Sequence, residues 1–337
     1  MWFLNKMLFG SSLALGTMIA ISAYSWMGMW MGLEINLLSF VPLMSMPKNS
    51  YSSESALKYF IAQAAASTML LLSLIILSSK SPFIASKADY ASTILNTSLL
   101  LKMGAAPLHF WFPEVMEGLS WLNASILLTW QKIAPMVLLI YSNKTVLLMV
   151  SVIISCMLIS GILGQNHLSL RKIMAYSSIN HIGWMIAASL FMEIIWLIYF
   201  LIYTIINLNI VIMFKKLNIF YMKQLILSIS YEPLLKLFFI LNFLSLGGLP
   251  PFLGFMPKWL TIQILSENQF FSLAVVMIIA TLMTLFFYMR VTFSTFVLSS
   301  NSLILLPQNC LHKSFIMTAN LVTLASLILS TLAFNFL

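Results

Sequence analysis

The sequence predicts an all-α polytopic membrane protein with about eleven transmembrane helices. Of its 337 residues, 61% are hydrophobic and only 7% are charged, and the mean hydropathy is +1.01. A soluble domain carries roughly 25% charged residues, so this chain has too few charges to cover a soluble surface. Apolar runs of about 20 residues, enough to cross a hydrocarbon core of ~30 Å, recur from end to end without a linker. We therefore expect residues 1–337 to form a single integral membrane domain.

The expected spans follow one another with short connections. Lipid offers no partner for a free backbone group, so each span is expected to be a helix, and the period-two alternation of a membrane barrel is absent. The first span lacks a convincing cleavage site and is interpreted as a helix that is retained. The ranges are 7–26, 27–46, 56–78, 91–113, 122–141, 144–163, 170–190, 193–214, 233–265, 270–296 and 314–336.

The net charge of +9 is distributed in a way that indicates a membrane rather than a nucleic acid as the partner. One set of loops holds most of the cations, and an excess of cations marks the side from which a protein is inserted. This rule places the N-terminus on that side, and an odd number of spans places the C-terminus on the other. The loops on the cation-rich side hold Lys6, Lys48, Lys58, Arg171, Lys172, Lys215, Lys216, Lys223, Lys236 and Lys313. The loops on the other side hold Lys80, Lys87 and Lys144.

Two apolar segments are interrupted by glycine and proline. Residues 99–114 read LLLKMGAAPLHFWFPE, and residues 245–260 read SLGGLPPFLGFMPKWL. A break inside a membrane frees backbone groups, and it is tolerated only where protein buries them or water reaches them. We therefore predict a hydrated ion path at each break. A proline kink that only shapes packing is the alternative.

The two interrupted segments also resemble each other. Aligning Gly104 with Gly247 places Pro107 on Pro250. The segments are the fourth and ninth spans, so they cross the bilayer in opposite directions. Paired broken helices of opposite direction are the sequence sign of an inverted repeat.

Four ionisable residues lie deep within spans: Glu34, Lys102, Lys132 and Lys258. A charge at the bilayer centre costs at least ~2.5–3.5 kcal/mol, so it needs a function or a partner. Burial favours the neutral forms of lysine and glutamate, whereas pairing favours the charged forms. A group on which these two effects nearly balance can gain or lose a proton easily, as a proton relay requires. We expect Glu34 to pair with Lys102 in such a relay and Lys132 and Lys258 to continue the path. The alternatives are fixed buried ion pairs and, for Lys132 and Lys258, side chains that reach the membrane surface.

Histidine and cysteine add few further candidates. His109 and His181 titrate near neutral pH, so each could carry protons, although a structural histidine is an equal alternative. Cys156 and Cys310 are too few for an iron–sulfur cluster or a thiolate zinc site. A haem held by the two histidines is disfavoured, because no haem pattern flanks them. We expect no cofactor and no metal in this chain.

Six segments in this order resemble the subunit 2 family of mitochondrial NADH:ubiquinone oxidoreductase (respiratory complex I), the short animal form of its antiporter-like subunits. The resemblance covers the chain up to about residue 296. The segments are MGLEINLLSF (31–40), SESALKYF (53–60), LLLKMGAAPLHFWFPEVMEGLSW (99–121), LLTWQKIAP (127–135), LRKIMAYSSINHIGW (170–184) and NFLSLGGLPPFLGFMPKW (242–259).

This resemblance implies a function, a site and a location. Family members lie in the membrane arm of the complex among its other subunits and lipids, contain two inverted five-helix repeats, and take part in proton translocation. The redox groups of the complex (NADH, flavin, iron–sulfur clusters and ubiquinone) lie elsewhere. The resemblance also implies the inner mitochondrial membrane, with the N-terminus in the matrix and the C-terminus in the intermembrane space. The residues that match the family's glutamate, lysines and motif histidines are Glu34, Lys102, Lys132, Lys258, His109 and His181.

Two other functions fit parts of the sequence. A stand-alone cation/proton antiporter would use the same broken helices and lysines. A structural subunit that conducts nothing would not need buried charges, so the cost of inserting them argues against it.

Overall fold

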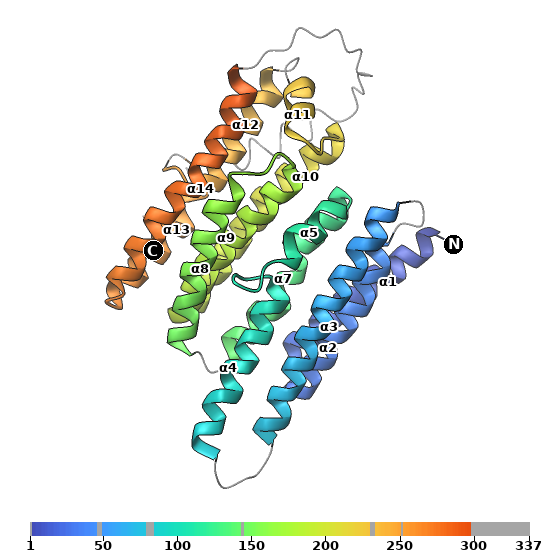
Figure 1. Ribbon diagram of the computed structural model, residues 1–337, viewed down its shortest axis with the longest axis vertical. Helices are drawn as coiled ribbons and strands as arrows, with labels where there is room; N and C mark the ends of the chain where they lie inside the picture. The colour runs from blue at the N-terminus through green and yellow to red at the C-terminus, as the bar shows by residue number, and fades with distance from the viewer. Residues whose placement is uncertain are drawn as a thin grey trace. The chain divides into compact units, whose positions relative to one another are not determined.

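A computed structural model describes the chain over residues 2–45, 49–78, 84–142, 145–229, 233–250 and 252–297, and every regular element within these ranges is a helix. The chain divides into two compact units, Met1–Cys156 and Met157–Leu337, with the boundary inside helix α8 (Figure 1). The prediction of an all-α polytopic architecture is confirmed for the described part of the chain.

The first unit is built from helices that pack against their neighbours in the sequence. Helix α1 packs on α2, α2 on α3, and α3 on both α4 and α5; α1, α2 and α3 run side by side in blue in Figure 1. The elements are α1 (Trp2–Ser22), α2 (Trp26–Met44), α3 (Ser50–Ser78), α4 (Ile84–Met103), α5 (Trp111–Gly118), α6 (Trp121–Leu128), α7 (Trp130–Tyr141) and α8 (Val146–Gly164), the last of which continues into the second unit.

The second unit is organised around α9, α10, α12 and α14, with α13 in contact with α9, α10 and α14. A short antiparallel bridge between Ser169 and Tyr221 joins the connections on either side of α9 and α10. The elements are α9 (Leu170–Phe191), α10 (Glu193–Leu217), α11 (Met222–Ile229), α12 (Pro233–Gly247), α13 (Phe255–Glu267) and α14 (Phe271–Val297).

Ten of the eleven predicted spans coincide with helices, and the eleventh, 314–336, lies outside the described residues. Within the described ranges, six spans are both long and apolar enough to cross a membrane, and the chain is a multi-pass membrane protein. Spans four and nine are each divided into two helices, as the sequence predicts. Span five carries an interruption that the sequence analysis missed, at Thr129 between α6 and α7. Helix α11 was not predicted either.

Helix α9 has the length of a membrane span but carries many polar residues. Its side chains from Ile173 to Ser189 are buried all around the helix. A helix that is enclosed by protein needs no apolar face toward lipid, so it can carry serine, asparagine and histidine if they find partners. This position explains why a helix with the sequence YSSINHIGW lies inside a membrane protein.

Glycine allows α1 and α2 to approach closely. A Cβ atom on Gly32 would lie 2.5 Å from the backbone nitrogen of Ala20, and one on Gly16 would lie 2.9 Å from that of Asn36. Small residues let membrane helices pack backbone to backbone. The other glycine of this stretch, Gly28, lies instead beside Ala23 and Ser25 at the turn.

We predict that Gly32→Val destabilises the chain by about 1–3 kcal/mol, because its side chain would force α1 away from α2. The matched control is Gly10→Val, which adds the same side chain to α1 where no heavy atom lies within 4 Å. The measurement is the midpoint of thermal aggregation of the detergent-solubilised chain. Equal midpoints for the two variants would contradict the close packing.

Candidate functional site

Helix α4 ends at a glycine whose backbone only glycine adopts readily. Gly104 has φ +74°, its N–H donates to the carbonyl of Leu101 (3.1 Å), and the N–H of Ala105 donates to that of Leu100 (3.0 Å). These two bonds form the Schellman arrangement that closes a helix C-terminus. The chain then runs without helical bonds until α5 begins at Trp111. The side chain of Phe112 fills the space beside Gly104, 3.0 Å from where a Cβ would lie.

Helix α12 ends in the same way, which corrects the register of the predicted alignment. The glycine with positive φ is Gly248 (φ +78°), not Gly247, and Leu249 N–H donates to the Leu244 carbonyl (3.4 Å). With Gly104 placed on Gly248, Pro113 aligns with Pro257, whereas the alignment on Gly247 leaves these two prolines one residue apart. The matching pairs are Gly104 and Gly248, the helix starts Trp111 and Phe255, and Pro113 and Pro257.

Each break leaves carbonyl groups at a helix end, and side chains satisfy them. In the first unit, the Gln63 amide on α3 donates to the carbonyl of Lys102 (3.1 Å), and the Trp111 indole donates to that of Leu101 (3.1 Å). In the second unit, Lys258 Nζ lies 2.8 Å from the carbonyl of Gly247 and 3.5 Å from that of Leu246. A carbonyl end carries partial negative charge, so the ammonium group of lysine is a favourable partner.

Helix α8 holds the segment between α4 and α5. Ala106 N–H donates to Cys156 Sγ (3.2 Å), and Ser155 Oγ donates to the Ala106 carbonyl (2.9 Å). Cys156 is fully buried. Both backbone groups of one residue in the break are therefore satisfied by consecutive side chains of a neighbouring helix.

The two lysines of the first unit are buried within it. Lys102, in the last turn of α4, is 6% exposed, and Lys132, on α7, is 1% exposed. Lys132 Nζ lies 5.8 Å from the ring centroid of Phe112, within the range of a cation–π contact. The alternative that Lys132 reaches the membrane surface is therefore wrong, and its position one turn after the interruption at Thr129 places it deep in the unit.

Lys102 borders a small polar cavity of about 10 Å³, roughly the volume that one water molecule requires. An amide chain forms much of its wall. Tyr59 hydroxyl donates to Gln131 Oε1 (3.4 Å), and Gln131 Nε2 donates to Asn36 Oδ1 (3.0 Å). Gln63 completes the polar lining. A water molecule here would have the two to four polar partners that buried water needs.

Glu34 lies on α2, half-buried, two residues from Asn36. Its carboxylate is close enough to act electrostatically on Lys102, but the two groups form no ion pair within 4 Å. Its Oε1 atom is buried and accepts no hydrogen bond from any residue that the structure describes. The predicted pair is thus two neighbouring charges rather than a salt bridge.

Lys258 and His181 lie in the second unit. Lys258, on α13, is 6% exposed, and its Nζ lies 5.9 Å from the ring centroid of Trp184. The Lys258 side chain crosses Gly248 so closely that a Cβ there would lie 2.8 Å from Cδ. Lys258 is therefore turned inward to the break and does not extend to the surface. His181 Nδ1 lies 2.8 Å from the Tyr199 hydroxyl of α10.

The remaining predicted residues occupy simpler positions. His109 is 2% exposed in the segment between α4 and α5, and its Nδ1 lies 3.2 Å from the Pro107 carbonyl. Glu114, at the start of α5, forms an exposed ion pair with Lys58 (2.9 Å), which also pairs with Glu54 (3.0 Å). Exposed pairs of this kind contribute little to stability. Within the described ranges, no three histidine, cysteine or acidic residues gather into a metal site.

Comparison with known proteins agrees with this arrangement. Residues 23–284 match the family described as NADH:quinone oxidoreductase/Mrp antiporter, transmembrane. Over 290 residues, the chain is 50% identical to "NADH-ubiquinone oxidoreductase chain 2" of Anopheles gambiae, covering 85% of this chain and 84% of that one. The chain belongs to the NADH:quinone oxidoreductase/Mrp antiporter transmembrane family.

Two further comparisons extend the match. The protein of the same name from Aedes aegypti is 45% identical over 325 residues, 95% of each chain. A chain in the structure titled "Respiratory complex I from Thermus thermophilus with bound Aureothin" matches with a TM-score of 0.85 and 22% identity, over 95% of this chain and 77% of that one. At this identity the likeness shows a shared fold.

Several polar side chains that lie around the lysines and His181 were not predicted. Gln63, Gln131 and Asn36 surround the cavity at Lys102, and Tyr199 contacts His181. The sequence signal for these residues was an amide side chain within an apolar span, close to a buried charge. Gln131 directly precedes Lys132, and Asn36 is two residues after Glu34. Which of them meet depends on how the helices pack.

We predict that Gln63→Leu lowers the free energy of unfolding by about 1–3 kcal/mol, because it leaves the buried Lys102 carbonyl without its donor. The matched control is Gln263→Leu on the exposed face of α13, where Gln263 pairs only with Glu267 (3.0 Å). Its expected change is within about 0.5 kcal/mol. Thermal stability in detergent gives the comparison, and two equal shifts would argue against the role of Gln63.

Proposed function

We propose that this chain is a membrane-arm subunit of NADH:ubiquinone oxidoreductase that takes part in proton translocation. In this role it works within the assembled complex, beside other membrane-arm subunits, in the inner mitochondrial membrane. The observation that carries this conclusion is its 50% identity, over 85% of its length, to a protein named as chain 2 of that enzyme. Proton movement here is coupled to NADH oxidation and ubiquinone reduction elsewhere in the complex, and we propose that this chain holds no redox cofactor itself.

Lys102 is the proposed proton carrier of the first unit. Its side chain is buried beside a polar cavity of the size of one water molecule. Lysine suits this role because burial favours its neutral form, while a nearby carboxylate such as Glu34 favours the charged form. In the proposed step, the Lys102 ammonium gives a proton to water in the cavity and later takes one back. The amides of Gln63, Gln131 and Asn36 orient that water.

Lys132 and Lys258 are the proposed carriers beyond this cavity. Lys132 follows Gln131 in α7 and is buried in the same unit as Lys102. Lys258 binds the carbonyl end of α12 at the second break. His109 and His181 are the proposed accessory carriers, because each lies buried beside a carbonyl or a hydroxyl group.

The alternative of a stand-alone cation/proton antiporter uses the same side chains. The family name includes Mrp antiporters, so family membership alone does not separate the two functions. The relatives from Anopheles gambiae and Aedes aegypti, 50% and 45% identical, are named as a chain of NADH-ubiquinone oxidoreductase, which favours the respiratory complex. A purely structural subunit would have no use for three buried lysines at this energetic cost.

We predict that Lys102→Met lowers NADH-driven proton pumping and coupled quinone reduction by about tenfold or more, because the side chain keeps its length and loses its exchangeable proton. The measurement is proton uptake and NADH oxidation by the complex reconstituted in liposomes. Assembly, judged by native gel, should be retained.

The control for the loss of charge is Lys215→Met, at the exposed C-terminal end of α10. It should pump at the rate of the unmodified complex. Normal pumping by Lys102→Met would exclude Lys102 as a carrier. A stand-alone antiporter would leave NADH oxidation unchanged in both variants.

We propose that the N-terminus faces the matrix and the C-terminus the intermembrane space, as the distribution of cations in the loops favours. In mitoplasts, which lack the outer membrane, an N-terminal epitope should therefore be protected from added protease, while a C-terminal epitope should be cleaved. The reverse pattern would overturn this orientation.

A further inference from the structure

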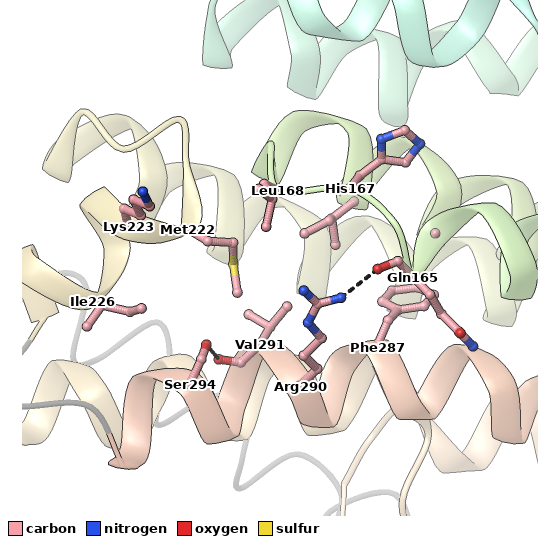
Figure 2. Close-up of a pocket in the computed structure, with 12 residues that line it drawn as sticks. Gln165, His167, Leu168, Met222, Lys223, Ile226, Phe287, Arg290, Val291 and Ser294 are labelled. Atoms are coloured by element: carbon pink, nitrogen blue, oxygen red, sulfur yellow. Dashed lines mark hydrogen bonds between the residues drawn. The ribbon is translucent and has the colours of Figure 1, made fainter.

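The second unit contains a cavity that the proposed proton path does not use. Its volume is about 200 Å³, and it lies among the connection after α8, the short helix α11 and the second half of α14. Figure 2 shows side chains converging on it from these three segments. The lining combines an apolar wall, which includes Met222, Phe287 and Val291, with three basic residues: His167, Lys223 and Arg290.

Arg290 is held at the cavity by a hydrogen bond to the backbone. One guanidinium nitrogen donates to the carbonyl of Gln165 at 2.7 Å, shown as the dashed line in Figure 2. A guanidinium group carries five N–H donors in a fixed plane. One hydrogen bond to a backbone carbonyl fixes the guanidinium plane at the cavity and leaves N–H donors for another ligand. Arginine can bind an oxyanion with two of these donors in a bidentate arrangement.

No carboxylate competes for these cations among the residues that line the cavity. The two acidic residues that the structure describes in this unit lie at distant helix ends. Glu267 precedes α14, about five turns from Arg290. Glu193 begins α10, whose opposite end leads toward α11. Among the described residues, Lys223 and Arg290 therefore make the cavity electropositive, and no acidic side chain lines it.

The apolar surface beside the cavity suits a ligand with acyl chains. Phe286 and Phe293 are four residues before and three residues after Arg290, so the three side chains share one side of α14. These phenylalanines are 60% and 55% exposed. Phe287 and Ser294, on the adjoining stripe, line the cavity. Arg290 thus stands at the border between an electropositive cavity and an apolar face.

We propose that this cavity binds the phosphate headgroup of an anionic phospholipid, with an acyl chain lying along Phe286 and Phe293. Basic pockets between membrane helices, near the ends of those helices, are where such headgroups bind. A free phosphate ion would use Arg290 but not the phenylalanines. A zwitterionic phospholipid would bring its own cation to a cavity that already holds three basic residues.

The test is photocrosslinking of the assembly that contains this chain, placed in phosphatidylcholine nanodiscs. The probe is phosphatidylglycerol with a diazirine near the head of one acyl chain, and mass spectrometry of the digested chain locates the label. We expect labels within 162–168, 222–229 or 286–297, lost on adding excess unlabelled phosphatidylglycerol. Competition by phosphatidylcholine to the same degree, or labels confined to other segments, would overturn the proposal. Full competition by inorganic phosphate would overturn the assignment to a lipid.

Variants test the contribution of Arg290. Arg290→Gln should lower the labelling by about tenfold, as expected for loss of charge-assisted hydrogen bonds, and Arg290→Lys should retain most of it. The matched control is Lys215→Gln, which removes one exposed cation of the same unit outside the cavity. An equal loss in this control would mean that net charge alone attracts the lipid, contrary to the proposal. The competition experiment on the unmodified assembly decides the matter if Arg290→Gln fails to assemble.

Discussion

A helix that is interrupted inside a membrane must find protein partners for the backbone groups it frees, and the rest of this structure depends on that constraint. Gly104 and Gly248 turn the last carbonyls back into the helix by Schellman bonds. What remains is satisfied from other helices: Gln63 of α3 and Ser155 of α8 each reach a backbone group of the first break. Helix packing around the breaks is thus fixed by hydrogen bonding as well as by shape.

The two breaks use different chemistry to meet the same requirement. In the first unit a neutral amide, that of Gln63, covers the carbonyl of Lys102, so the lysine side chain is left to border the cavity. In the second unit the lysine itself, Lys258, covers the carbonyls of α12. An amide holds a carbonyl at any pH, whereas an amine binds it best when protonated. The carbonyl end of α12 is therefore bound by a group that titrates, whereas the Lys102 carbonyl at the end of α4 is bound by one that does not.

Much of the fold could be read from the sequence, because a membrane helix carries its own apolar length and the breaks in spans four and nine each carry a glycine; the interruption at Thr129 has none and was not predicted. The limits appear at particular residues. Gly247 and Gly248 are adjacent, and only the backbone angle shows which one ends α12. Helix α9 was recognisable as a span, but its enclosure was not. The lysines stood out as isolated charges, whereas Gln63 and Cys156 act on residues far away in the chain, so their roles depend on tertiary packing.

The contact of Lys258 with the end of α12 gives that helix end a sensitivity to proton occupancy. A proton that leaves the ammonium group weakens its bond to the Gly247 carbonyl, and Gly248 leaves the neighbouring backbone free of a Cβ that would resist movement. Protonation of this lysine and the position of the end of α12 are therefore linked through one hydrogen bond. By the reciprocity of linked equilibria, any force that shifts the end of α12 changes the proton affinity of Lys258.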